Sequence, residues 1–214
     1  MTFQFKKVIL RKPNNSIVNA LSSKSIKPIF NEIVKEHNLY LNTLKNLELE
    51  VHILDKLEEY PDSIFVEDPA LIYKSSCIIL NPSSPSRNGE SKIINKEIKK
   101  FFEHLLFIKE GTVEGGDVLN INDHFIIGLS NRTNLLGAQN LSNLLISIGA
   151  TVKICETPRD VLHFKSECSL LDDNLILVSK RMSKIDYLKT NYQLIELPNG
   201  EEGAANSLRI NNKL

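Results

Sequence analysis

The sequence predicts an α/β protein in which a strand–strand–helix–strand unit recurs as blades around an axis. Short apolar strands occur in pairs joined by polar turns, and an amphipathic helix follows each of the first pairs. The polar residues that open successive hairpins are nearly evenly spaced, with 47 positions from Glu67 to Glu114 and 49 from Glu114 to His163. Strand-rich repeats of about 40–50 residues are typical of propeller blades rather than stacked solenoids.

The segment before the first unit predicts a strand, a helix and a strand. The run KKVILRKP (6–13) is a short apolar strand that ends at Pro13. Residues 28–47 have the helical apolar period, and residues 49–54, LEVHIL, return as a strand. The apolar side chains on the helical face are Phe30, Ile33, Val34, Leu41, Leu44 and Leu47.

The first unit has strands in FVEDPALIY (65–73) and CIILN (77–81), joined around residues 74–76. A helix is expected over residues 90–106. Its predicted inner face consists of Ile94, Ile98, Phe102 and Leu105.

The second unit has a hairpin in GGDVLNINDHFIIGL (115–129), turning at Asn122-Asp123. A helix over residues 133–148 follows, and Gly149 is expected to cap its end. The apolar residues on its buried side are Leu141, Leu144, Leu145 and Ile148. The strand TVKIC (151–155) completes the unit.

The third unit pairs LHFKSECSLL (162–171) with NLILV (174–178), then continues with a short helix and the strand YQLIEL (192–197). AANSLRI (204–210) begins a fourth hairpin, which turns at Asn211-Asn212. The chain has two residues beyond that turn, and an unfinished hairpin leaves an apolar face uncovered. We therefore expect residues 1–214 to form a single propeller domain that is truncated in its last blade.

The composition is that of a soluble globular protein, with 42% hydrophobic and 24% charged residues. Twenty-six basic residues balance 26 acidic ones, so no net charge favours nucleic acid or an anionic membrane. Cys77, Cys155 and Cys168 are odd in number and widely spaced, which favours reduced thiols in a cytoplasm. The apolar run VIL near the start is too short for a signal peptide or a membrane span.

Equivalent residues of successive blades should converge near the axis. Five polar residues would then share one pocket: Glu67, Asp68, Glu114, Asp117 and His163. Carboxylates beside one histidine suit a cationic ligand with several N–H donors, such as a guanidinium. The remaining histidines have no partners at metal-ligand spacing, so we predict neither a metal nor a cofactor.

Each of these residues also has a structural interpretation. His163 follows an apolar pair, as core histidines do, and Glu67-Asp68 could form a solvated turn. Glu114 and Asp117 could instead cap the kink between them, and for that reason we leave Asp117 out of the catalytic set. Three further residues stand where turns or helix starts commonly use them: Asp62, Arg87 and Arg132.

Several segments, in order, resemble the dimethylarginine dimethylaminohydrolase family of the guanidine-modifying pentein superfamily. They are PDSIFVEDPAL (61–71), SRNGE (86–90), GTVEGGDVL (111–119), LSNRTNLLGAQ (129–139) and VLHFKS (161–166). The resemblance extends from the strand VILRKP to the end of the chain. It implies a five-bladed α/β propeller of ββαβ units, which agrees with the repeat.

The resemblance also implies a reaction: an ω-methylated arginine is hydrolysed to citrulline and a methylamine. A cysteine thiolate attacks the guanidinium carbon, and a histidine gives a proton to the leaving amine. Water activated by the same histidine then releases the thiouronium intermediate. Arginine deiminase and amidinotransferase chemistry are close alternatives.

By motif position, the resemblance makes His163 the general acid/base and Glu114 the carboxylate that orients it. The segment NNSIVNALSS (14–23), with Ile17, matches a loop that closes over the substrate. The other substrate-binding residues implied are Asp62 for the α-ammonium, Glu67 and Asp68 for the guanidinium, and Arg87 and Arg132 for the α-carboxylate.

The family's nucleophile opens the hairpin of the final blade. Continuing the period from Gly203 places that position roughly 40–50 residues further on, and none of the three cysteines occupies it. We therefore expect the 214-residue chain alone to be inactive and poorly stable. A non-catalytic arginine-binding pseudoenzyme and a purely structural propeller remain as alternatives. The expected partner is a small-molecule substrate, not nucleic acid or a membrane, and a homodimer stays open.

His163 and Cys168 stand five positions apart and suggest a catalytic pair. In an extended strand they would point to opposite faces, roughly 16–17 Å apart. We therefore predict that Cys168 is a buried residue and that His163 has its sulfur partner elsewhere.

Overall fold

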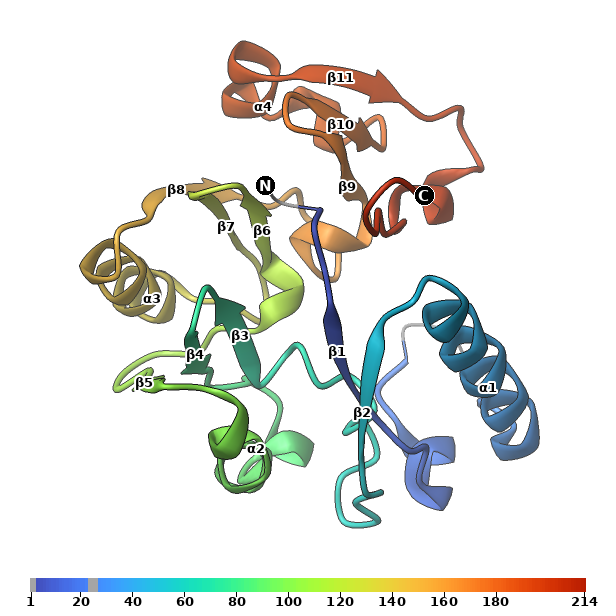
Figure 1. Cartoon of the computed structure of the whole chain (residues 1–214). Coiled ribbons are helices and arrows are strands. Elements are labelled where there is room, and N and C mark those ends of the chain that lie inside the picture. Colours follow the sequence, from blue (N-terminus) through green and yellow to red (C-terminus); the bar gives the residue numbers. More distant parts are fainter. Residues whose placement is uncertain (1–2, 23–26) are drawn as a thin grey trace.

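The computed structural model of the chain describes residues 3–22 and 27–214. Within this part, small β-sheets stand around a central region and the helices lie outside them (Figure 1). The described residues form three sheets of three strands and one of two. This arrangement confirms the α/β propeller architecture predicted from the repeat.

The two-stranded sheet contains β1 (Lys7–Arg11) and β2 (Glu50–Leu54), which are parallel. Helix α1 (Phe30–Asn46) connects them, preceded by the 3-10 turn η1 (Asn15–Asn19). All three main elements were predicted. The C-terminal turn reaches this blade, because Asn211 donates its backbone N–H to the carbonyl of Phe3 at 2.7 Å.

The three larger sheets share one connection pattern. Two antiparallel strands form a hairpin, a helix crosses outside, and the third strand pairs parallel to the second. The strands are β3 (Ala70–Tyr73), β4 (Ser76–Ile79), β5 (His104–Phe107), β6 (Val118–Ile121), β7 (His124–Leu129), β8 (Thr151–Glu156), β9 (Cys168–Asp172), β10 (Leu175–Val178) and β11 (Gln193–Glu196). The crossing helices are α2 (Glu90–Ile98), α3 (Leu135–Ser147) and α4 (Asp186–Asn191).

Turn residues fix the hairpins as expected. Lys74, Asn122 and Asn211 have positive φ values of 53°, 59° and 55°, the left-handed geometry that tight hairpin turns require. Gly149, with φ of 90°, follows the last residues of α3 as predicted. At its other end, the helix is capped by the Asn134 side chain, which accepts the N–H of Gly137.

The predicted helix over 90–106 is too long. Helix α2 ends at Ile98 and a 3-10 turn, η3 (Lys99–Phe101), follows. Leu105 therefore lies in β5, paired parallel with Cys77 of β4, and not on a helical face. Pairing with β4 satisfies the backbone groups of this apolar run, which local periodicity could not distinguish from a helix.

The first strands of the hairpins begin later than predicted. Residues 65–69 form turns before β3, and the 3-10 turns η4 (Gly115–Asp117) and η5 (Phe164–Ser166) precede β6 and β9. The extended strand assumed between His163 and Cys168 is therefore wrong. Cys168 is nevertheless fully buried, with its Sγ 3.2 Å from the carbonyl oxygen of Phe164.

Apolar side chains fill the spaces between neighbouring blades. One core cluster joins the second and third three-stranded sheets through residues such as Ile126, Phe164 and Ile176. A second core cluster joins the first and second three-stranded sheets and includes Ile78, Phe125 and Leu141. No helix in residues 3–22 and 27–214 has both the length and the apolar character needed to cross a membrane.

Candidate active site

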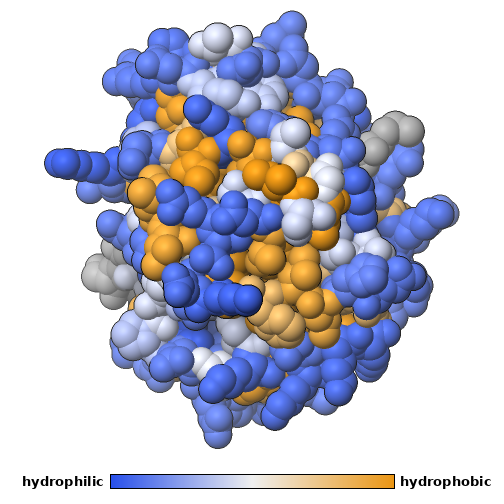
Figure 2. Space-filling view, turned by 90° about the vertical axis from the view of Figure 1, so that its left-hand side faces the viewer, coloured by the Kyte–Doolittle hydropathy of each residue, from blue (hydrophilic) through white to orange (hydrophobic). Residues whose placement is uncertain are grey.

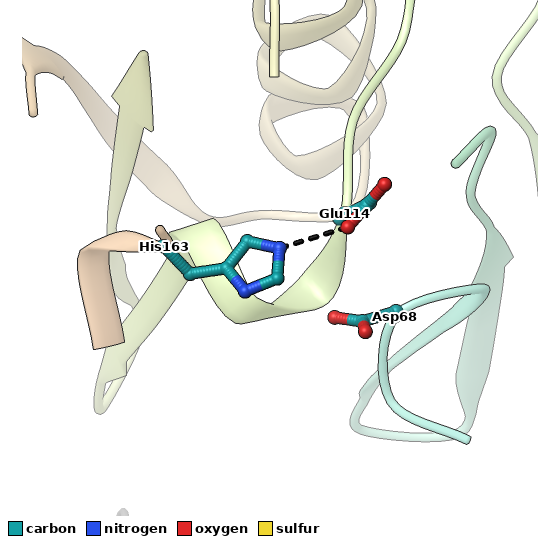
Figure 3. A group of neighbouring side chains, drawn as sticks. All are labelled: Asp68, Glu114 and His163. Atoms are coloured by element: carbon teal, nitrogen blue, oxygen red, sulfur yellow. Dashed lines mark hydrogen bonds and ion pairs between the residues drawn. The ribbon is translucent and has the colours of Figure 1, made fainter. Parts of the chain in front are cut away.

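The loops that precede the first strand of each three-stranded sheet meet on one side of the central region. Asp68 precedes β3, Glu114 precedes β6 and His163 precedes β9. One oxygen or nitrogen atom from each of these side chains lies within 4.8 Å of the other two (Figure 3). The repeat therefore brings together residues that are almost 50 positions apart in the sequence, as the convergence argument required.

His163 and Glu114 form the central pair of the site. The imidazole Nε2 lies 2.8 Å from Oε2 of Glu114, whose side chain is only 1% exposed. The other carboxylate oxygen, Oε1, accepts hydrogen bonds from the backbone N–H and the hydroxyl of Ser83. Figure 3 shows that Nδ1 of His163 makes no bond to the residues drawn. The imidazole is thus held at one nitrogen, while the second is available to exchange a proton.

The charges around His163 favour its protonated form. Burial alone would lower its pKa, but the hydrogen bond to Glu114 and the negative charges of Asp68 and Asp117 raise the pKa above the ordinary 6.5. Burial would raise the pKa of Glu114, and the bonds from His163 and Ser83 outweigh it and lower that pKa. The raised pKa of His163 and the lowered pKa of Glu114 both favour the imidazolium–carboxylate form of the pair.

Asp68 is oriented by protein donors on both oxygens. Its Oδ2 accepts from Nη1 of Arg87 at 2.6 Å and its Oδ1 from the N–H of Gly116 at 3.0 Å. Arg87 is itself buried, and Glu90 accepts from its Nε at 2.7 Å and its Nη2 at 3.1 Å. This chain of charge-assisted bonds fixes Asp68 beside the imidazole.

Asp117 lies beneath the site and is fully buried. Its Oδ1 accepts the N–H of Phe164 at 2.8 Å, and its Oδ2 accepts the hydroxyls of Ser130 and Thr133. These contacts agree with the structural interpretation that kept Asp117 out of the catalytic set. The bond to Phe164 holds the backbone next to His163 in place.

Gly116 allows the His163 ring to approach the backbone. A Cβ atom at this position would lie 2.7 Å from Cγ of His163. Only glycine therefore fits between η4 and the imidazole in this arrangement.

Asp62 has one bonded oxygen and one without a partner. The N–H of Leu21 donates to Oδ1 at 3.0 Å, while Oδ2 is buried and has no hydrogen-bond partner among the described residues. Burial raises the pKa of Asp62, with the positive charges of Arg87 and Arg132 acting in the opposite direction. An unpartnered buried carboxylate oxygen is costly unless a donor such as an ammonium group binds it.

The predicted closing loop is attached to the same region. Ile17 is buried in η1, and the Asn14 side chain donates to the carbonyl of Tyr60 and to the Ser63 hydroxyl. Leu21 bonds Asp62, as described above, so the loop contacts the predicted ammonium subsite. Ser23, the last residue of the predicted loop, lies outside the described residues.

The two predicted carboxylate-binding arginines differ in their surroundings. The Arg87 guanidinium is held by Asp68 and Glu90, and its Nη2 also donates to the carbonyl of Phe65. The nearest carboxylate oxygen to Arg132 is Oε1 of Glu114, at 3.9 Å from Nη1, and the Arg132 side chain is one-fifth exposed. Arg132 is thus the more available of the two guanidinium groups for a ligand.

The Glu67 side chain is more exposed than those of Asp68 and Glu114. Its Oε1 lies 3.1 Å from Nζ of Lys165 in η5. Sequence reasoning assigned no role to Lys165, Ser83 or Glu90. Lys165 stood within the quoted motif VLHFKS, but nothing local indicated that it would face Glu67, which is 98 positions away in the chain.

The set Asp68, Glu114 and His163 has the donor types of a metal site. Both carboxylates already accept protein hydrogen bonds, Asp68 from Arg87 and Gly116, and Glu114 from Ser83. The hydrogen bonding fits an oriented acid/base better than a metal centre.

None of the three cysteines faces the imidazole as an activated thiol. Cys77, Cys155 and Cys168 are free and buried within β4, β8 and β9. Burial raises the pKa of the Cys77 thiol to about 12 and also raises the pKa of Cys155 and Cys168. Buried thiols of this kind are unreactive.

Comparison with known proteins identifies the family of the chain. The family model described as "N,N dimethylarginine dimethylhydrolase, eukaryotic" matches residues 3–197. The N(G),N(G)-dimethylarginine dimethylaminohydrolase of Pseudomonas aeruginosa is 34% identical, and the match covers 98% of this chain and 83% of the relative. The enzyme of that name from Streptomyces coelicolor is 28% identical over 80% of this chain and 67% of the relative.

Solved structures agree with the sequence comparison. A cysteine-to-serine mutant of the Pseudomonas aeruginosa enzyme in complex with citrulline matches with a TM-score of 0.93, covering 97% of this chain and 82% of that one. The N-terminal domain of a cyanobacterial arginine dihydrolase matches with a TM-score of 0.85, covering 97% of this chain and 81% of that one; at 14% identity, this likeness shows a common fold alone. The chain described here belongs to the dimethylarginine dimethylaminohydrolase family.

Proposed function

We propose that the site binds an Nω-methylated arginine and serves its hydrolysis to citrulline and a methylamine. The observation that carries this proposal is the buried pair of His163 and Glu114, set beside Asp68 with Nδ1 of the imidazole left available. The orphaned oxygen of Asp62 and the less restrained guanidinium of Arg132 support binding of an α-amino acid end. The match to relatives that carry the name of this activity agrees with the chemistry of the pocket.

In the proposed reaction, Glu67 and Asp68 bind the guanidinium nitrogens and hold the central carbon in place. A thiolate adds to that carbon, and the imidazolium of His163 protonates the amine as the C–N bond breaks. The neutral imidazole then takes a proton from water, whose oxygen attacks the thiouronium carbon. The C–S bond breaks as the citrulline ureido group forms, the remaining hydroxyl proton passes to the released amine or to solvent, and the thiolate is restored.

A second candidate is ligand binding without turnover. The observation that favours it is the burial of all three cysteines away from the imidazole. The residues of this chain would then supply the base and the ligand-binding groups, but not the nucleophile. For the polypeptide of residues 1–214 tested alone, we expect binding with little or no turnover.

Two measurements decide between these functions. Citrulline production from asymmetric dimethylarginine is followed colorimetrically, with His163→Ala as the control. Calorimetric titrations with arginine, methylarginines and citrulline then measure binding. Turnover lost in His163→Ala would establish hydrolysis by these residues, and binding alone would establish the second candidate. Absence of both turnover and binding would overturn the proposed function.

We also propose that two copies of the chain pair through an apolar face. Figure 2, which views the side where α3 and β5 lie, shows a hydrophobic patch. Helix α3 contains no charged residue, and the exposed apolar side chains on these elements are Phe107, Leu135, Leu136 and Ile146. A helix without charged side chains can meet its own copy without like charges opposing each other. Sedimentation should show a dimer that Leu136→Glu dissociates; a monomer at all concentrations would refute it.

The proposed location of the protein is the cytoplasm. Its three cysteines are free, buried and separate, as is usual in a reducing compartment. Fractionation of cells that express a tagged full-length protein tests this assignment.

A further inference from the structure

Lys165 places a positive charge on the carboxylate that the proposed function reserves for a substrate guanidinium. Its Nζ lies 3.1 Å from Oε1 of Glu67. The Lys165 backbone belongs to η5, which is held by the bond between Phe164 and Asp117 and by the N–H of Ser166 donating to the carbonyl of His163 at 2.9 Å. The ammonium thus enters the site from a fixed turn, two residues after the imidazole.

The contact between Lys165 and Glu67 is of a kind that ligands can break. The two side chains are 26% and 62% exposed, in contrast to the buried pair of Arg87 and Glu90. Exposed ion pairs contribute little because solvent screens them and both long side chains lose freedom. A lysine ammonium is a point charge, whereas a guanidinium offers several N–H groups that match a carboxylate.

We propose that Lys165 is the resident counter-ion of the ligand site: its ammonium neutralises Glu67 while the pocket is empty or holds an uncharged ureido product, and it withdraws when a guanidinium binds. This inference rests on the proposed ligand class. Two cations at one carboxylate repel each other, so substrate binding displaces the ammonium. Once the ligand loses its charge, the ammonium returns to Glu67 and favours product release.

The surrounding electrostatics agree with this role. The positive charge of Lys165 is the main cause of a lowered pKa at Glu67, with burial opposing it and His163 adding to it. Burial and the negative charge of Glu67 raise the pKa of Tyr40 in α1. The pKa of Glu67 thus depends on the cations beside its carboxylate, of which Lys165 has the largest effect.

The test compares a cationic with an uncharged ligand in one set of variants. Calorimetry measures the dissociation constants of asymmetric dimethylarginine and citrulline for the wild type, Lys165→Met and Lys165→Arg. Removing the resident charge should tighten binding of the cation about fivefold relative to citrulline, the upper range for an exposed ion pair. Lys165→Arg keeps the charge and can pair with Glu67 through several N–H groups, so it should not tighten binding of the cation relative to citrulline.

Lys7→Met is the matched control, because Lys7 forms an ion pair with Glu50 at the same 3.1 Å distance on the first blade. It should leave the ratio unchanged. An unchanged ratio in Lys165→Met, with both ligands still bound, would overturn the inference and leave the proposed function intact. If neither ligand binds to the wild type or to Lys165→Met, both this inference and the proposed function are wrong. Binding of the cation to Lys165→Met alone would support the inference.

Discussion

The contact between Glu114 and His163 predicts a large change in the histidine pKa when the carboxylate is neutralised. Glu114→Gln keeps the shape of the side chain and the oxygen that accepts from Ser83, but it removes the charge opposite Nε2. A hydrogen bond to a charged group contributes about 1.5–3 kcal/mol, so its loss should lower the pKa of His163. Burial, which lowers this pKa, is left opposed only by Asp68 and Asp117.

The same pair should make stability depend on pH in a defined window. The folded-state pKa of His163 is raised, so its contribution is complete below its unfolded pKa of about 6.5 and is lost as pH rises through the folded value. The pKa of Glu114 is lowered, so its contribution is present above about 4.5 and is lost as pH falls through the folded value. The advantage of the wild type over Glu114→Gln should therefore be greatest between about pH 4.5 and 6.5.

Nuclear magnetic resonance titration of the histidine Cε1–H signals measures the pKa, and denaturant unfolding at several pH values measures stability. His124 is the internal control, because its ring nitrogens bond the hydroxyls of Thr151 and Tyr187 and not a carboxylate. Its pKa should not move in Glu114→Gln. An unchanged His163 pKa in a folded Glu114→Gln variant would refute the assignment of Glu114 as the group that tunes the imidazole.

Other substitutions test the groups around this pair. Gly116→Ala should push the His163 ring away from Glu114 and weaken citrulline binding. Gly203→Ala is the control, because a Cβ there would meet open space. Equal affinities of the two variants for citrulline would contradict the close approach of Gly116 to His163. Asp62→Asn should weaken citrulline binding about 10–100-fold. It should leave the affinity for a citrulline analogue without the α-amino group unchanged. Burial raises the Asp62 pKa. The free energy of unfolding of the wild type should therefore fall relative to that of Asp62→Asn as pH rises from about 3.8 through the raised pKa. Parallel stability curves for the two proteins would contradict this expectation. Glu90→Gln should cost about 3 kcal/mol in denaturant unfolding by leaving the buried Arg87 charge less compensated; a loss no larger than that of the exposed Glu58→Gln would rule this out.

Sequence reasoning predicted most of the elements because the repeat combines two local signals. Strands were found as short apolar runs between turn residues, and helices from the apolar period, as with Leu141 and Leu145 in α3. The even spacing of Glu67, Glu114 and His163 predicted that these residues open successive hairpins, whereas in the structure they lie just before β3, β6 and β9. The boundaries failed where a distant partner decides the conformation, as it does for β5, which becomes a strand by pairing with β4.

The turn after His163 is the clearest case of such a distant partner. The run LHFKSECSLL was predicted to be one strand, which implied an extended chain from His163 through Cys168. In the structure, the N–H of Phe164 donates to Asp117, which is 47 positions earlier, and the chain turns there. A pattern within residues 161–171 contains no information about that acceptor.

Buried hydrogen bonds between blades therefore position the side chains of the site, as strand pairing positions the strands within each sheet. The sheets bring the three loops to the same region, but pairing within a sheet cannot set the distance between side chains of different sheets. That distance is set by Asp117 bonding Phe164, by Gly116 bonding Asp68 and by Ser83 bonding Glu114. Because these bonds cross between blades, a substitution such as Asp117→Asn should disturb the position of His163 before it disturbs the strands, since the core clusters that hold the sheets remain intact.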